Sequence, residues 1–149
     1  MSCEKAIYRK LRERGFRLTP QREMVLSVMH EMDGFATADD IFEGVHVLSA
    51  AVDISTIYRT LDLLQDFDAV VAIDLGDGQR HYKLAGTQGP QLHLVCRSCG
   101  LVIGLGQAQQ QPLAALVRDH TGFEVDIGHL SIPGLCADCR VAQTTARSE

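Results

Sequence analysis

The spacing of apolar residues predicts four helices in the first 67 residues. In each, apolar side chains recur three or four positions apart, which is the period of one helix face. Two helices also carry start signals: Thr19-Pro20 is an N-cap with a first-turn proline, and Thr37–Asp40 is a capping box. The predicted helices span about residues 5–14, 20–32, 38–45 and 55–67.

Two strand-like segments follow, residues 70–75 and 79–84, and the Gly-Asp-Gly between them is a tight hairpin signal. Helices followed by a hairpin are typical of a winged helix-turn-helix domain, which we predict over residues 1–85. Residues 86–91 are rich in glycine and polar side chains, and we predict a hinge there.

The second half of the chain predicts a smaller α/β domain over residues 92–140. Strands are expected at 92–96 and 101–105, a helix opening at Pro112, and a further strand at 123–127, where apolar residues alternate. The polar residues 141–149 predict a disordered tail. The expected fold class is therefore α+β with two domains.

The composition, 46% hydrophobic and 22% charged over 149 residues, is that of a globular protein. No apolar run approaches the roughly 20 residues that cross a bilayer. The N-terminus lacks the apolar core of a secretory signal. We therefore expect a cytoplasmic protein with no membrane partner, in which thiols stay reduced.

The net charge of −5 is unusual for a DNA-binding protein, but the charge is unevenly distributed. Residues 1–22 hold seven of the 14 basic side chains and two of the 19 acidic ones, which leaves seven basic and seventeen acidic for the rest. Such a basic leading segment is compatible with local phosphate contacts, and equally with a solvated helix face.

The fourth predicted helix has a polar face near its N-terminal half, the half that a recognition helix inserts into the major groove. Its hydroxyls and arginine suit phosphates and base edges, and a tyrosine ring suits a thymine methyl. An ordinary amphipathic helix would show the same face, so both interpretations stay open. The candidate DNA-binding residues on it are Ser55, Thr56, Tyr58 and Arg59.

Two CxxC pairs, Cys96 with Cys99 and Cys136 with Cys139, carry the strongest chemical signal. Each pair can give a metal two thiolates, and four thiolates form the closed tetrahedral site of a structural Zn²⁺. In so small a domain the metal would contribute directly to folding. A redox CxxC is the alternative. Cys3 is expected to be a free surface thiol.

In order along the chain, these motifs resemble those of the ferric uptake regulator family of bacterial metal-dependent repressors, from about Lys5 to Arg140. The matching stretches are GFRLTPQR at 15–22, ADDIF at 38–42, STIYRTL at 55–61, HLVCRSCG at 93–100 and CADC at 136–139.

The resemblance implies a transcription repressor that binds a palindromic double-stranded DNA operator as a homodimer. It places Tyr58 and Arg59 at the DNA, and Arg14 and Arg17 in a minor-groove contact. It also matches the four paired cysteines to the family's structural zinc ligands. Such a protein is not an enzyme, and it has no catalytic residues and no small-molecule substrate. The alternatives are a zinc-stabilised protein-interaction module and a thiol redox protein.

The family's regulatory metal ligands are mostly replaced in this chain. Where the family has a histidine before the third helix, this chain has Phe35. Where the family has a ligand after the wing's aromatic residue, this chain has Lys83. The histidine-rich run before the first CxxC reads PQLH, so it keeps only His93. The carboxylate after that CxxC is missing from residues 103–105, and the glutamate of the next helix falls in the run 107–111, which contains none.

Three histidines, His81, His93 and His129, are candidates for rebuilding a regulatory site. Such a set would suit iron, zinc, nickel or manganese as a second divalent metal. Three unrelated histidines, two of them satisfied by hydrogen bonds, are the alternative. Because Lys83 would repel a cation, we expect the regulatory site to be degenerate.

Overall fold

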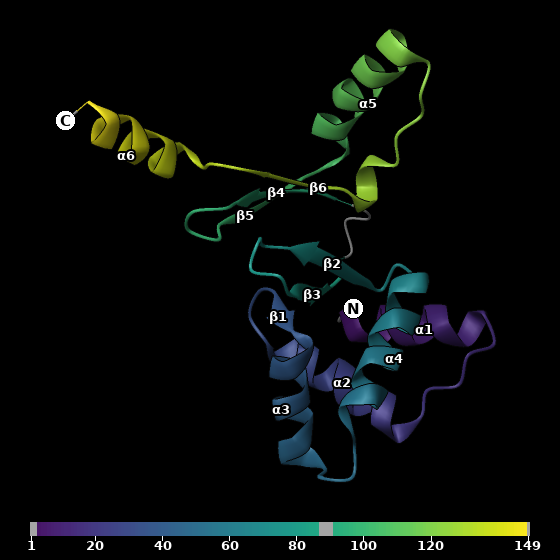
Figure 1. Cartoon of the computed structure of the whole chain (residues 1–149). Coiled ribbons are helices and arrows are strands. Elements are labelled where there is room, and N and C mark those ends of the chain that lie inside the picture. The colour runs from purple at the N-terminus through teal and green to yellow at the C-terminus, as the bar shows by residue number, and fades with distance from the viewer. Residues whose placement is uncertain (1–2, 87–90, 149) are drawn as a thin grey trace. The chain divides into compact units, whose positions relative to one another are not determined.

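A computed structural model describes residues 3–86 and 91–148 of the chain. Packing divides it into two units, residues 1–72 with 79–87 and residues 73–78 with 88–149, here called the first and second units. Figure 1 shows helices α1 to α4 below one small sheet, and a second sheet that belongs to the later part of the chain. No helix among the described residues is both long and apolar enough to cross a membrane.

The first unit contains the four predicted helices, which confirms their number and order. They are α1 (Cys3–Glu13), α2 (Pro20–Glu31), α3 (Ala38–Leu48) and α4 (Ile54–Asp66). Thr19 caps α2 through the Arg22 N–H, with Pro20 at the first helical position as expected. The capping box of α3 is also present, because Thr37 and Asp40 each accept the other's backbone N–H.

A three-stranded sheet in the order β1-β3-β2 completes this winged arrangement (Figure 1). Its strands are β1 (Ala36–Thr37), β2 (Val70–Asp74) and β3 (Arg80–Leu84). The predicted hairpin turn is confirmed: Gly76 and Gly78 have φ of 84° and 78°, a region that favours glycine. Asp74 Oδ1 accepts the Gly76 N–H at 2.7 Å and fixes the turn.

Helices α1 to α4 and strands β1 to β3 close over one apolar core. At its centre are side chains with no solvent exposure, among them Leu26, Ile41, Ile57 and Leu61. Because these residues come from α2, α3 and α4, the core fixes α4 against its neighbours and leaves the opposite face of α4 exposed. The position of α4 is therefore fixed by ordinary core packing.

The second unit is built on a sheet in the order β5-β4-β6. The strands β4 (Leu92–Cys96) and β5 (Val102–Leu105) are antiparallel, and β6 (Ser131–Gly134) lies parallel to β4. Helix α5 (Gln107–Thr121), a short 3₁₀ turn η1 (Ile127–His129) and helix α6 (Ala137–Arg147) complete it. The predicted α+β fold class is confirmed by this mixture of helices and sheets.

Three predictions for the second unit are wrong. Helix α5 begins at Gln107 rather than at Pro112, which lies inside it. The preceding glutamine-rich run forms helix readily, and Gln110 Nε2 anchors that first turn by donating to the Leu105 carbonyl. Residues 123–126 form no strand, because β6 takes the free edge of β4 and Phe123 stays 66% exposed.

The third error concerns the predicted disordered tail, because residues 141–147 continue α6. The hydroxyls of Thr144 and Thr145 donate to the carbonyls of Arg140 and Val141, one turn back. No described side chain of α6 is buried, so this helix rests on local bonds rather than on packing. The predicted hinge at 86–91 falls largely outside the described residues.

Candidate metal centre and nucleic-acid interface

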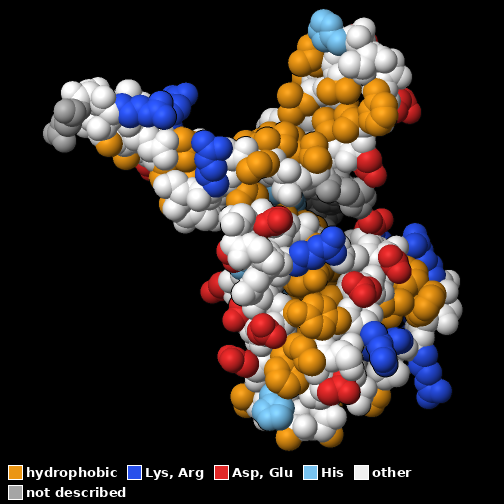
Figure 2. All heavy atoms as spheres, in the orientation of Figure 1, with side chains coloured by type: hydrophobic (Ala, Val, Ile, Leu, Met, Phe, Trp, Pro, Cys, Tyr) orange, Lys and Arg blue, Asp and Glu red, His pale blue; other side chains and the backbone are white. Residues whose placement is uncertain are grey.

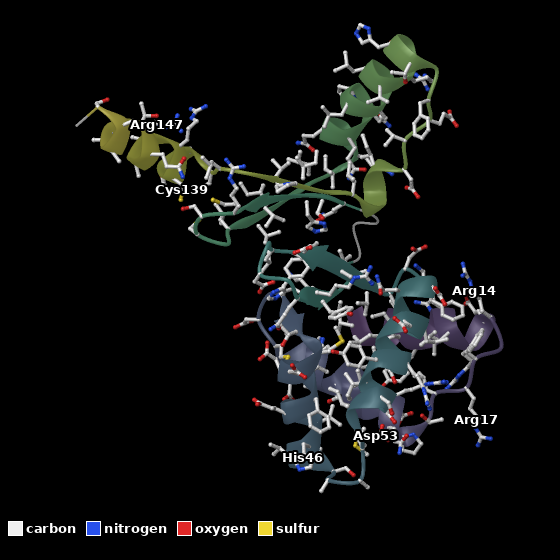
Figure 3. All side chains as sticks on the ribbon, viewed as in Figure 1. Arg14, Arg17, His46, Asp53, Cys139 and Arg147 are labelled. Carbon is white, nitrogen blue, oxygen red and sulfur yellow. The ribbon has the colours of Figure 1, made fainter. Side chains whose placement is uncertain are left out.

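The structure brings all four paired cysteines together at one end of the β4–β6 pair. Cys96 ends β4 and Cys99 lies in the following turn, while Cys136 caps α6 and Cys139 lies in its first turn. Parallel pairing of Cys96 with Gly134 places the second CxxC pair beside the first. The α6 end of this cluster is labelled at Cys139 in Figure 3.

The distances within this cysteine cluster fit one metal ion. All four Sγ atoms lie within 4.8 Å of one another, and Cys99 Sγ is 3.7 Å from Cys136 Sγ. Four thiolates 2.3 Å from a tetrahedral zinc ion would lie about 3.8 Å apart. The cluster therefore has the donor type, number and spacing that hold a structural metal, and it is the one such group among the described residues.

Hydrogen bonds already prepare one of these thiols to ionise. The backbone N–H groups of Cys136, at 3.4 Å, and of Cys99 and Ser98 donate toward Cys96 Sγ and lower its pKa to about 6. At Cys139 the Ser98 hydroxyl lowers the pKa, but the neighbouring thiols raise it more, to about 12. Four adjacent thiolates repel one another, and a divalent cation among them would remove that cost.

The polar face of α4 is exposed as predicted. Tyr58 is 46% exposed, Arg59 is exposed beside it, and Ile57 on the opposite face is fully buried. Thr60 turns inward and donates its hydroxyl to the Thr56 carbonyl at 2.8 Å. Helix packing therefore presents the tyrosine and the arginine together to solvent.

Asp53, which the sequence analysis missed, organises the start of this face. As N-cap of α4 it accepts hydrogen bonds from the Thr56 N–H, the Thr56 hydroxyl and the Ser55 hydroxyl, at 2.8, 2.8 and 2.9 Å. These bonds from Thr56 and Ser55 lower the pKa of Asp53 below its usual value. The two hydroxyl hydrogens are thus directed at Asp53. The signal for Asp53 was an Asp directly before a helix start.

The two predicted minor-groove arginines lie in the α1–α2 connection, and both are labelled in Figure 3. The guanidinium of Arg14 lies 5.3 Å from the centroid of the Phe67 ring, against which Phe16 also packs edge-on at 4.6 Å. The Arg17 carbonyl accepts a hydrogen bond from Arg22, and its side chain is exposed.

Among the described side chains, the group that could hold a metal is the cysteine cluster, and the regulatory set of His81, His93 and His129 stays a prediction. His81 lies on β3 in the first unit, opposite Thr37, and is partly exposed. His93 lies on β4 in the second unit and is 9% exposed. His129 ends the η1 turn rather than a strand, and its side chain lies outside what the structure describes.

A winged arrangement of helices joined to a metal-binding α/β unit defines a class of metal-linked DNA-binding regulators. The sequence matches the family model described as "Ferric uptake regulator family" over residues 13–132, and the chain belongs to that family. Its members are transcription regulators and not enzymes.

Relatives and solved structures agree with this assignment. The ferric uptake regulation protein of Synechococcus elongatus is 31% identical over 133 residues, which cover 88% of this chain and 90% of that protein. The Bacillus subtilis ferric uptake regulation protein is 30% identical over 141 residues, 93% of this chain and 95% of that protein. The Helicobacter pylori ferric uptake regulator has the same fold, with a TM-score of 0.69 at 19% identity over 94% of this chain and 95% of that one.

Proposed function

We propose that this protein is a cytoplasmic repressor that binds palindromic operator DNA as a homodimer, with α4 as its recognition helix. The observation that carries the proposal is the exposed Tyr58–Arg59 pair on the outer face of a helix whose inner face is locked in the core. An arginine there can hold a phosphate or a guanine edge, and the tyrosine ring can contact a thymine methyl. A zinc uptake regulator solved with zinc and DNA shares this fold, with a TM-score of 0.66 at 22% identity over 97% of this chain and 99% of that one.

The remaining predicted DNA contacts divide by their chemistry. Arg14 and Arg17 present positive charge at the α1–α2 connection, where a minor-groove contact needs it. Ser55 and Thr56 give their hydroxyl hydrogens to Asp53, and Thr56 gives its backbone N–H to it as well, so the two hydroxyl oxygens approach DNA as hydrogen-bond acceptors. Removal of either hydroxyl is therefore expected to act through the N-cap of α4 as well as through DNA.

We propose Zn²⁺ as the metal of the cysteine cluster. Four thiolates in a closed arrangement leave no open position for a substrate, which is the pattern of a structural site. Bound zinc would supply a cross-link between the end of β4 and the start of α6. The chain's own part is to place Cys96 and Cys136 by the β4–β6 pairing and to donate backbone N–H groups to the Cys96 sulfur.

Exposed apolar side chains of the second unit support the proposed homodimer. Figure 2 shows hydrophobic side chains gathered over α5 and the strands near it. They include Leu116 at 55%, Ile103 at 44% and Ile132 at 41% exposure. A second copy of this chain would bury these exposed apolar side chains.

We further propose that the family's regulatory metal site is degenerate here. A divalent first-row metal needs about four to six donors from protein and water. At the matched positions His93 keeps a ligand and His129 lies near a further one, whereas Phe35, Lys83, Gln91 and Leu92 supply no strong ligand. A second divalent metal, whether iron, manganese, zinc or nickel, would need the set of His81, His93 and His129.

The experiment that tests this function is selection of DNA sequences from a random pool by the zinc-loaded protein. A palindromic consensus is expected. Arg59→Ala should weaken binding to it about tenfold and lower the slope of affinity against salt by about one, the signature of a lost phosphate contact. Arg147→Ala, which removes an exposed charge from α6, is the matched control and should change neither.

Tyrosine variants separate the ring from its hydroxyl. Tyr58→Phe should bind nearly as well as wild type, and Tyr58→Ala should lose about tenfold if the ring makes the contact. Wild-type binding by both Tyr58→Ala and Arg59→Ala would show that α4 is not the reader. No selected sequence at all would favour the zinc-stabilised interaction module, and loss of zinc with rapid thiol oxidation would favour the redox protein.

A further inference from the structure

Phe35 and Lys83 stand at two positions where the family has regulatory metal ligands, and their side chains contact one another. In the first unit, Ala36 pairs with Tyr82 across β1 and β3. The same antiparallel register, one step further, places Phe35 opposite Lys83. The Lys83 Nζ lies 5.8 Å from the centroid of the Phe35 ring. This distance is within the roughly 6 Å over which an ammonium group is attracted to an aromatic face.

A second contact, between Gln91 and Gly104, lies in the second unit. Gly104 is on β5, opposite His93 of β4. The Gln91 side chain covers Gly104, because a Cβ built on this glycine would lie 2.5 Å from Gln91 Oε1 and 3.3 Å from Gln91 Cδ. A carboxylate at residue 104 would have to displace the Gln91 amide. Gln91 therefore packs on the segment 103–105, from which the family's carboxylate is missing.

Both replacements therefore form contacts of their own, and the first supplies a positive charge. A regulatory metal held partly by the first unit would need donor atoms at residues 35 and 83, which lie on two segments that are already paired by β1 and β3. In this chain the Lys83 side chain of β3 carries an ammonium group, and the Phe35 ring on the paired segment lies within contact distance of it. The Lys83–Phe35 contact thus links β3 to the segment before β1 without a bound metal ion.

We infer that Lys83 is a built-in cation that replaces the regulatory metal in the first unit, so that the protein binds DNA whether or not divalent metal is present. This inference rests on the proposed function. The Lys83–Phe35 contact holds the wing strand β3 against the start of α3, and β3 is thereby kept in one position relative to the recognition helix. The affinity for DNA then does not depend on the metal concentration, and the extent of repression is set by the concentration of the protein.

The first test is a double-mutant cycle on thermal unfolding of the zinc-loaded protein without DNA. Lys83→Gln and Phe35→Leu should each lower the unfolding temperature, and the double variant should lower it by clearly less than the sum. Lys83→Arg should behave as wild type because a guanidinium also stacks on aromatic rings. Additive effects of Lys83→Gln and Phe35→Leu would overturn the proposed contact.

The second test measures affinity for the selected DNA without added metal and then with Mn²⁺, with Zn²⁺ and, under anaerobic conditions, with Fe²⁺. Wild type should vary less than threefold across the series. Lys83→Gln and Phe35→Leu should each weaken binding about threefold to tenfold with an unchanged salt slope. A slope lower by about one in Lys83→Gln alone would identify Lys83 as a phosphate contact instead.

A wild-type affinity that rises tenfold or more with one of these metals would overturn the inference, and its loss in His81→Ala and His93→Ala would locate a working sensor. If no DNA sequence is selected, the proposed function fails. The unfolding cycle needs no DNA, so it would still decide whether Lys83 and Phe35 are coupled.

Discussion

The two units differ in how they are held together. In the first, eighteen buried hydrophobic residues form one cluster drawn from all four helices and the sheet. Among the described residues from 91 onward, the buried hydrophobic side chains are Leu92, Val95, Cys96 and Ile127. A unit of that size with so few buried side chains gains little from apolar burial. The first unit is thus stabilised by its core, whereas the second buries few side chains of its own, and the proposed metal and partner surface would add the stability that its core lacks.

The largest expected effect is loss of the metal. Zinc binding to a four-ligand structural site is worth about 10 kcal/mol or more, which exceeds the stability of a small domain. Cys96→Ser should therefore abolish zinc retention and unfold the second unit, while amide exchange in α2 and α4 stays slow. Elemental analysis and hydrogen exchange measure the two outcomes.

The control for this experiment is Cys3→Ser, which removes the one cysteine outside the cluster and should leave one zinc per chain. A Cys96→Ser protein that kept its zinc and its unfolding temperature would disprove the structural metal site. If Cys96→Ser unfolded both units together, the first unit would not be stable on its own core alone.

Next in size is a cavity in the first unit. Leu61 has no solvent exposure at the centre of the core, and Leu61→Ala should lower the free energy of unfolding by about 3 kcal/mol or more. Zinc content should be unchanged. Val47→Ala, at a residue that is 86% exposed, should stay within about 0.5 kcal/mol of wild type. Equal effects of the two changes in urea unfolding would contradict the packing described above.

The helices and strands between residues 3 and 84 were predictable because each had a local signal. Helix periodicity, the Thr37–Asp40 capping box and the Gly-Asp-Gly turn all act over a few residues, and the structure confirms all three. In the second unit, the proximity of the two CxxC pairs was also predictable, because four thiols of one site must meet. The two pairs could be expected to meet because they share one type of metal ligand, although Cys99 and Cys136 are 37 positions apart in the sequence.

Other features of the second unit depend on long-range pairing that no local pattern reveals. Strand β6 contains Pro133 and only four residues, so nothing in its sequence marks it as the partner of β4. The alternation at 123–127 is genuine as a pattern, but among its apolar residues only Ile127 becomes buried. The contacts of Lys83 with Phe35 and of Gln91 with Gly104 likewise depend on strand register, which the sequence leaves open.

A third prediction concerns the apolar surface of the second unit. Leu116→Asp places a charge on α5 where we propose that a second copy packs, and it should raise the dimer dissociation constant at least a hundredfold, about 2.7 kcal/mol. Val47→Asp makes the same kind of change on an exposed residue of α3 and should leave the oligomeric state as it is. Sedimentation over a range of concentrations distinguishes them. A Leu116→Asp protein as dimeric as wild type would place the dimer contact elsewhere.

The smallest expected effect is at the capping box of α3. Thr37 Oγ1 accepts the Asp40 N–H at 3.1 Å, and Asp40 accepts the Thr37 N–H at 3.0 Å. Thr37→Ala should therefore destabilise the first unit by about 1 kcal/mol at neutral pH and leave zinc content unchanged. Urea unfolding measures the cost, and Thr37→Ser, which keeps the hydroxyl, is the matched control. A Thr37→Ala protein as stable as wild type would show that the cap adds nothing.

Acid should remove part of the same contribution. The hydrogen bond from the Thr37 N–H, and then that with the Thr37 side chain, lower the pKa of Asp40 below its usual value. A carboxylate with a lowered folded pKa stabilises the fold above its unfolded pKa of about 4, and that stability is lost as the pH falls through the folded value. Asp40→Asn cannot lose a charge, so the gap in stability between wild type and Asp40→Asn should shrink from pH 6 to pH 3. Because both proteins carry the same cysteines, acid release of the metal cancels in this difference, which amide exchange in α3 can follow. A gap that stays constant over this range would mean that the Asp40 charge has no part in capping α3.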